Sequence, residues 1–113
     1  MNKSLIVHLF HILIVGGLFL YVGINQTKIF NFIYTVLIVL SIVIFIYHGY
    51  KVYLKCKEGK SYLINLFHMG VVAPLLLYIG LNGDKTKRFY FELLLMLGFT
   101  VIGYHGYYMI KGE

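Results

Sequence analysis

Four apolar runs limit the folds that this chain can adopt. They cover roughly residues 5–24, 29–54, 62–81 and 89–110, and most charged residues lie between them. An α-helix rises about 1.5 Å per residue, so each run is long enough to cross a hydrocarbon layer about 30 Å thick. Composition supports this reading, because 60% of the residues are hydrophobic and only 12% are charged. We therefore expect an all-α integral membrane protein with four transmembrane helices.

The sequence repeats itself without a gap. Residues 9–11 (LFH) recur as residues 66–68, and residues 47–50 (YHGY) recur as residues 104–107. Both pairs have the same offset of 57 residues. Similarity at one fixed offset indicates that a single structural unit is present twice.

Each copy contains two apolar runs, and we interpret it as a helical hairpin. The first hairpin covers residues 1–57 and the second covers residues 58–113. The first run matches a run in mid-chain, so we interpret it as a membrane span and not as a cleaved signal peptide. Because each copy crosses the membrane twice, both copies begin on the same side, as parallel repeats related by a pseudo-two-fold axis along the membrane normal. A four-helix bundle is the simplest closed arrangement of such repeats.

The basic residues flank the helices and do not form one patch, which argues against a nucleic-acid partner. Six of them lie near the termini or the central loop, and the other four lie in the two outer turns. The positive-inside rule then places both termini and the central loop in the cytoplasm. The expected partner is the lipid bilayer, and both a homo-oligomer and a larger membrane complex remain open.

Sequence motifs give little support to an enzymatic function. Cys56 is the only cysteine, so an intrachain disulfide and paired-thiol chemistry are excluded. The chain also lacks a glycine-rich phosphate loop and a lysine deep enough in a span to hold retinal. Glu92 lies in the first turn of its helix, where the helix dipole and nearby basic residues favour a carboxylate.

Histidines are the candidate functional residues. Each copy has one near its beginning, His11 or His68, and one near its end, His48 or His105. These residues lie about five or six positions inside their helices, or roughly 8–9 Å below the surface. Because neighbouring helices run in opposite directions, all four side chains are expected at one depth, which we call the histidine layer.

Three functions of the histidine layer are compatible with the sequence. The leading one is a cofactor site for a metal ion or haem b, because neutral imidazole ligates both. Such a protein would have an accessory, redox or ion-handling role. The first alternative is a proton or small-ion channel or transporter with the histidines as a relay. The second is a structural role, in which each histidine bonds to a tyrosine or a backbone carbonyl of a neighbouring helix.

One further histidine breaks the repeat. His8 precedes His11 by three residues, so both lie on one helix face. Its counterpart in the second copy is Asn65. We therefore interpret His8 as an interfacial residue and not as a fifth ligand.

Overall fold

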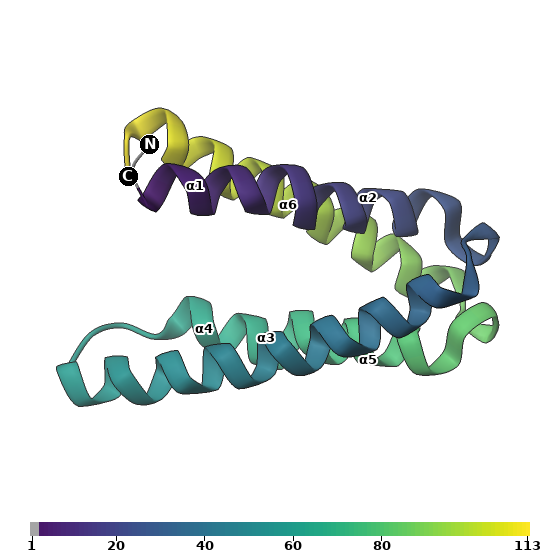
Figure 1. Ribbon diagram of the computed structural model, residues 1–113, viewed down its shortest axis with the longest axis horizontal. Coiled ribbons are helices and arrows are strands. Elements are labelled where there is room, and N and C mark those ends of the chain that lie inside the picture. The colour runs from purple at the N-terminus through teal and green to yellow at the C-terminus, as the bar shows by residue number, and fades with distance from the viewer. Residues whose placement is uncertain (1–2) are drawn as a thin grey trace. The chain divides into compact units, whose positions relative to one another are not determined.

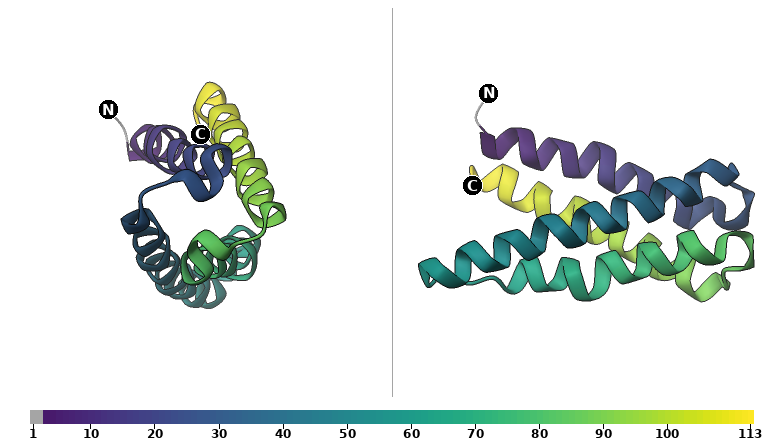
Figure 2. Two further views of the ribbon diagram at one scale, coloured as in Figure 1. Left: turned by 90° about the vertical axis from the view of Figure 1, so that its right-hand side faces the viewer. Right: turned by 60° about the horizontal axis from the view of Figure 1, so that its bottom comes forward.

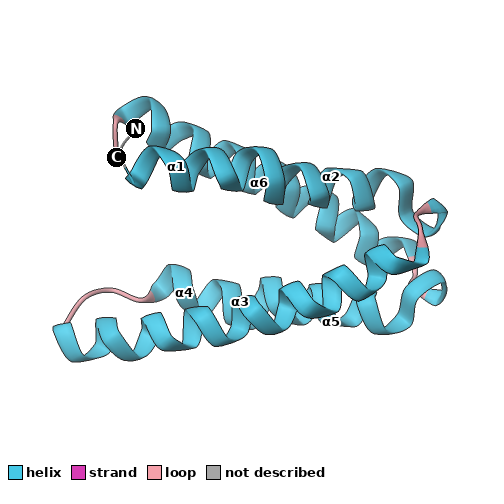
Figure 3. Ribbon diagram, in the orientation of Figure 1, coloured by secondary structure: helices cyan, strands magenta, loops and turns pink. Residues whose placement is uncertain are grey.

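The computed structural model is helical almost throughout (Figure 3). It describes residues 3–113, and that part of the chain contains no β-strand. Four helical segments are long and apolar enough to cross a membrane: Lys3–Lys28, Asn31–Glu58, Leu63–Lys85 and Arg88–Lys111. The predicted all-α fold with four membrane-length helices is thereby confirmed.

Two of the four long helices change type along their length. The first consists of α1 (Lys3–Phe10), the π-helix η1 (His11–Val15), α2 (Gly16–Asn25) and the 3₁₀ turn η2 (Gln26–Lys28). The third consists of α4 (Leu63–Phe67), the π-helix η3 (His68–Val72), α5 (Ala73–Asn82) and the 3₁₀ turn η4 (Gly83–Lys85). The second and fourth are the uninterrupted helices α3 (Asn31–Glu58) and α6 (Arg88–Lys111).

The chain divides into two compact units. The first unit combines Met1–Lys28 with Lys87–Glu113, and the second unit is Ile29–Thr86. Each unit therefore contains one long helix from each predicted repeat. The repeat boundaries, at residues 1–57 and 58–113, stay a prediction.

The first unit packs α1, η1 and α2 along α6 (Figures 1 and 2). Its core is apolar, and the side chains of Phe19, Phe91 and Leu94 are fully buried. The helices approach closely at Gly23, where an added Cβ would lie within 2.9 Å of the backbone of Leu95. Small residues allow such close approach between membrane helices.

The second unit packs α4, η3 and α5 along α3 in the same manner (Figure 2). Leu37, Leu76 and Ile79 are fully buried in its core. Close approach occurs at Gly80, where an added Cβ would lie 2.9 Å from the carbonyl oxygen of Tyr34. Gly80 follows Gly23 by the repeat offset of 57 residues. The close approach therefore occurs at equivalent glycines in the two helix pairs.

Local backbone features also recur after 57 residues. The two π-helices have this offset, as do the two 3₁₀ turns. Each turn begins with a positive φ, 55° at Gln26 and 56° at Gly83. Pro74 and its counterpart Gly17 are surrounded by the same helix types. The proline lies in the first turn of α5, where its missing N–H is tolerated.

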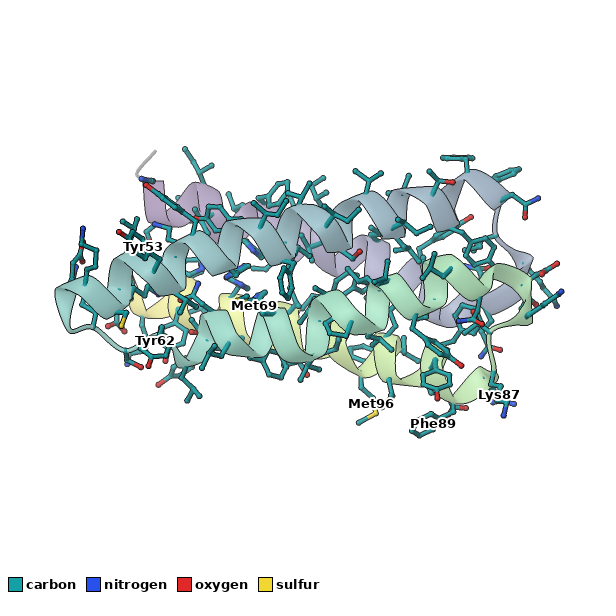
Figure 4. The ribbon with its side chains drawn as sticks, turned by 90° about the horizontal axis from the view of Figure 1, so that it is seen from below. Tyr53, Tyr62, Met69, Lys87, Phe89 and Met96 are labelled. Carbon is teal, nitrogen blue, oxygen red and sulfur yellow. The ribbon has the colours of Figure 1, made fainter. Side chains whose placement is uncertain are left out.

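The outer surface of the spans is apolar. Met96 and Phe89 project outward from α6 and are 64% and 59% exposed (Figure 4). Many other leucine, isoleucine, valine and phenylalanine side chains along the described helices are exposed as well. A water-soluble protein rarely exposes apolar surface of this extent. The helices are therefore suited to surroundings of lipid.

Candidate functional site

The equivalent histidines His11 and His68 are each the first residue of a π-helix. Nδ1 of His11 hydrogen-bonds the carbonyl oxygen of Val7 at 2.8 Å, and Nδ1 of His68 bonds that of Ile64 at 2.7 Å. Because a carbonyl only accepts, Nδ1 carries the proton in both rings. In the neutral ring Nε2 then holds the lone pair. π-Helical turns occur often at functional sites.

The predicted site residues meet in pairs within each unit. In the first unit the rings of His11 and His105 stack, with centroids 4.2 Å apart and planes 18° apart. In the second unit His48 and His68 stack, with centroids 4.0 Å apart and planes 13° apart. Histidines of different helices thus come into contact within each unit. That all four form a single ligand site stays a prediction.

In the first unit, His8 extends the histidine pair. Its Nδ1 lies 2.9 Å from Nδ1 of His105, and its Nε2 lies 2.8 Å from the carbonyl oxygen of Glu113. His8 is buried between α1 and α6, with 9% of its surface exposed. Its contact with a predicted site residue was not expected. The only signal in the sequence was its three-residue spacing from His11.

In the second unit, Asn65 occupies the place of His8. Lys55 donates from Nζ to Oδ1 of Asn65 at 2.6 Å. The amide nitrogen of Asn65 therefore faces Nδ1 of His48, 2.7 Å away. A side-chain amide nitrogen only donates, so Nδ1 of His48 accepts and its neutral ring carries the proton on Nε2.

Tyrosines border the histidine pairs. Tyr47 contacts His48 edge-on at a centroid distance of 5.1 Å, and Tyr104 contacts His105 at 5.2 Å. Nζ of Lys51 lies 5.9 Å from the centroid of the Tyr47 ring. Aromatic rings beside lysines are typical of the level where a helix meets the membrane surface.

Other polar residues give no second site. Within residues 3–113, no three histidine, cysteine, aspartate or glutamate side chains, those of the histidine pairs included, lie together in a way that could hold a metal ion. Glu92 accepts a hydrogen bond from Nε of Arg88 at 2.7 Å on the exposed side of α6, which is the charge pairing suggested by its place in the helix.

A cavity of about 360 Å³ in the second unit has no titratable lining residue; it is lined by Ser41, Ile42, Phe45, Ile46, Ala73, Pro74 and Leu77.

The histidine pairs bring chemically competent groups into the apolar spans. A neutral imidazole can take up a proton or a metal ion at its lone pair, and hydrogen bonds fix which nitrogen holds that lone pair. A helical fold by itself is compatible with many functions. Comparison with protein-family models, with curated proteins and with solved structures finds no match to this chain.

Proposed function

We propose that this chain is a small multi-pass membrane protein that binds a metal ion through its histidines, in an accessory, redox or ion-handling role. The observation that carries the proposal is the pair of equivalent hydrogen bonds from Nδ1 of His11 and His68 to backbone carbonyls. Histidines that ligate metals usually donate their second ring nitrogen in this way, which fixes the ring and leaves the other nitrogen to the metal.

Binding of a metal ion requires the rings to turn. The rings of His11 and His105 are stacked, with centroids 4.2 Å apart and planes 18° apart. The lone pair of an imidazole nitrogen lies in the ring plane, so both rings would turn before one zinc ion could be held by both nitrogens at about 2.0–2.1 Å. Zinc, copper and nickel all favour imidazole nitrogen. Each histidine pair supplies two ligands, so water or another small ligand would complete the coordination of the metal ion. Such replaceable ligands suit a protein that must take up and release the ion.

Haem b is the second cofactor of this class. Haem takes axial imidazoles on its two opposite faces. The rings of His48 and His68 instead lie face to face in contact, so both could not ligate one haem without separating. A metal ion is the cofactor that we favour, because it can be held at the edges of the rings once they turn, where the Nε2 lone pairs of His11 and His68 lie.

Recurrent features support duplication as the origin of this architecture. The π-helices and the histidine-to-carbonyl bonds all return after 57 residues. We accordingly propose two parallel hairpin repeats, with the lipid bilayer as the surroundings and with both termini and the central loop in the cytoplasm.

A proton pathway is the second candidate function, and the contact between His8 and His105 favours it. Their Nδ1 atoms are 2.9 Å apart, so a proton could pass from ring to ring inside the span. A purely structural role is the third. The same contact joins α1 to α6, and an interhelical hydrogen bond in a membrane stabilises by about 0.6–2 kcal/mol.

Elemental analysis and absorption spectroscopy of the protein in mild detergent separate these functions. We expect a bound metal that the double variant His11→Gln and His105→Gln loses. The matched control is Tyr107→Phe, which changes a polar side chain on the same helix and should retain the metal. Absence of metal and haem together with proton flux in liposomes would establish the pathway instead. Absence of both, with lower stability of the histidine variant, would leave the structural role.

A further inference from the structure

We infer that the second unit binds anionic phospholipid at the end of α3. The binding surface consists of tyrosine and lysine side chains in the last three turns of that helix, and we call it the lysine–tyrosine surface; its members are Tyr47, Tyr50, Lys51, Tyr53 and Lys57. The inference goes beyond the proposed function, because it requires neither a histidine side chain nor a metal ion. Failure of metal binding would leave it unchanged.

Positive charge is concentrated at this end of the second unit. Residues 51–60 (KVYLKCKEGK) contain four lysines and one acidic residue, a net charge of +3. At the other end of the unit, the turn η4 contains one acid and one base, Asp84 and Lys85. Clusters of four or more basic residues directly beside a membrane helix attract anionic lipids. The distribution of charge therefore favours negatively charged headgroups at the end of α3.

The one acidic residue of this segment does not neutralise the lysines nearest the span. Oε2 of Glu58 lies 3.0 Å from Nζ of Lys60, which follows the helix. Within residues 3–113, no carboxylate forms an ion pair with Lys51, Lys55 or Lys57. Lys55 donates to a side-chain amide, which is neutral. The positive charge of these three lysines is therefore not compensated by the chain.

Two lysines lie beside tyrosine rings. Nζ of Lys51 is 5.9 Å from the ring centroid of Tyr47, and Nζ of Lys57 is 5.4 Å from that of Tyr53. Both tyrosines are more than half exposed, and Tyr53 lies at the same end of the unit as Tyr62 (Figure 4). An ammonium group and a tyrosine hydroxyl both donate hydrogen bonds. Each tyrosine–lysine pair can therefore donate to phosphate oxygens, which accept strongly from charged donors.

One face of α3 has the same order of chemical groups as a phospholipid. Five residues follow one another at spacings of three or four, which places them on this face: Val43, Ile46, Tyr50, Tyr53 and Lys57. All five side chains are exposed. The face thus changes from apolar to aromatic to charged, as a lipid changes from acyl chain to interface to headgroup. A free phosphate ion would leave the apolar part of the face uncovered, so a phospholipid is the occupant that fits.

The equivalent end of the first unit has a weaker form of this surface. Nζ of Lys111 lies 5.2 Å from the ring centroid of Tyr107. The same Nζ lies 3.2 Å from Oε2 of Glu113. That carboxylate compensates the lysine and would repel a phosphate group. We therefore expect selection of anionic lipid at α3 and not at α6.

Fluorescence quenching by brominated lipids tests the location. The chain contains no tryptophan, so Tyr50→Trp introduces a single reporter beside the tyrosine–lysine pairs. Each lysine near a membrane surface contributes roughly fivefold to the binding of anionic lipid. In bilayers that contain the full-length protein, we expect brominated phosphatidylglycerol to bind about tenfold or more tightly than brominated phosphatidylcholine. Tyr107→Trp, at the equivalent place in the first unit, should give a ratio near one. Equal quenching by both lipids in Tyr50→Trp would overturn the inference.

Lysine variants in the Tyr50→Trp background test the cause. Lys57→Gln should lower the binding ratio about fivefold, whereas Lys57→Arg should retain it. Lys60→Gln is the matched control, because it changes the net charge equally but removes a lysine that Glu58 already compensates. It should change the ratio less than about twofold. Equal falls in Lys57→Gln and Lys60→Gln, or an unchanged ratio in Lys57→Gln, would contradict binding by the tyrosine–lysine pairs.

Discussion

The two units have equivalent helix types, but the space beside one pair of equivalent residues, Gly16 and Ala73, differs. In the first unit, α2 and α6 meet at Gly16, where an added Cβ would lie 2.7 Å from Cγ1 of Ile102. In the second unit the equivalent residue is Ala73, and a cavity of about 360 Å³ lies beside it. The equivalent backbones of the two units thus leave different amounts of space between their helices at this place, because the side chains differ. The histidine pairs differ as well, because His105 contacts His8 whereas the equivalent His48 contacts Asn65.

The largest expected effect tests what the units share. Gly23→Ala and Gly80→Ala each place a Cβ against the backbone of the facing helix. Overpacking of this kind typically costs about 1–3 kcal/mol. We expect both variants to lose this much unfolding free energy, measured by denaturant titration in mixed micelles. Gly103→Ala, where an added Cβ has nothing within 4 Å, is the control and should not be destabilised. A loss in one unit only would break the comparison.

The next effect concerns the polar contacts that distinguish the units. Asn65→Leu removes the partner of both Lys55 and His48. A polar group left without its partner costs about 1–3 kcal/mol, so we expect a loss of unfolding free energy in this range. Thr100→Val removes an exposed hydroxyl that bonds its own helix, and should cost far less. Equal losses in the two variants would show that the Asn65 contacts add nothing specific.

Different results are expected when a methyl group is added in the two units. Ala73→Val adds methyl groups beside an open apolar groove, so we expect no loss of unfolding free energy. Gly16→Ala adds one methyl group where Ile102 leaves no space, so it should destabilise. Thermal unfolding in one detergent measures both variants under the same conditions. A stabilised Gly16→Ala would show that the packing difference is not real.

The smallest effect is expected at the surface. Glu92→Gln removes the ion pair with Arg88, and both side chains are more than half exposed. Exposed ion pairs contribute about 0–1 kcal/mol, so unfolding free energy should change little. Proton flux in liposomes should also be unaltered. A large fall in flux would indicate that Glu92 takes part in proton movement.

Much of the fold could be predicted because it follows from local pattern. Apolar runs of membrane length gave four helices, and the offset of 57 residues identified equivalent positions such as Gly23 and Gly80. The repeat offset does not predict which helices pack together, because two residues can be equivalent in the repeats without being in contact. The pairing of the first helix with the fourth, and of the second with the third, therefore required the structure. The π-helices at His11 and His68 have no sequence signature.

Less of the candidate site could be predicted. The depth of the histidines in their helices predicts one layer of His11, His48, His68 and His105, and the structure shows contacts within the pairs His11–His105 and His48–His68. The role of His8 could not be predicted, because its second partner, Glu113, is 105 residues away in the sequence. The role of Asn65 depends on Lys55, which orients the amide across the loop between α3 and α4. Such long-range contacts decide which nitrogen of each ring is protonated.

X-ray absorption spectroscopy of the zinc-loaded protein tests the central claim most directly. The proposed site predicts nitrogen ligands at about 2.0–2.1 Å with the outer scattering of two imidazole rings. His11→Gln combined with His105→Gln should remove that scattering. A zinc ion surrounded by oxygen alone, or a protein that retains no zinc after buffer exchange, would contradict metal binding by the histidine pairs.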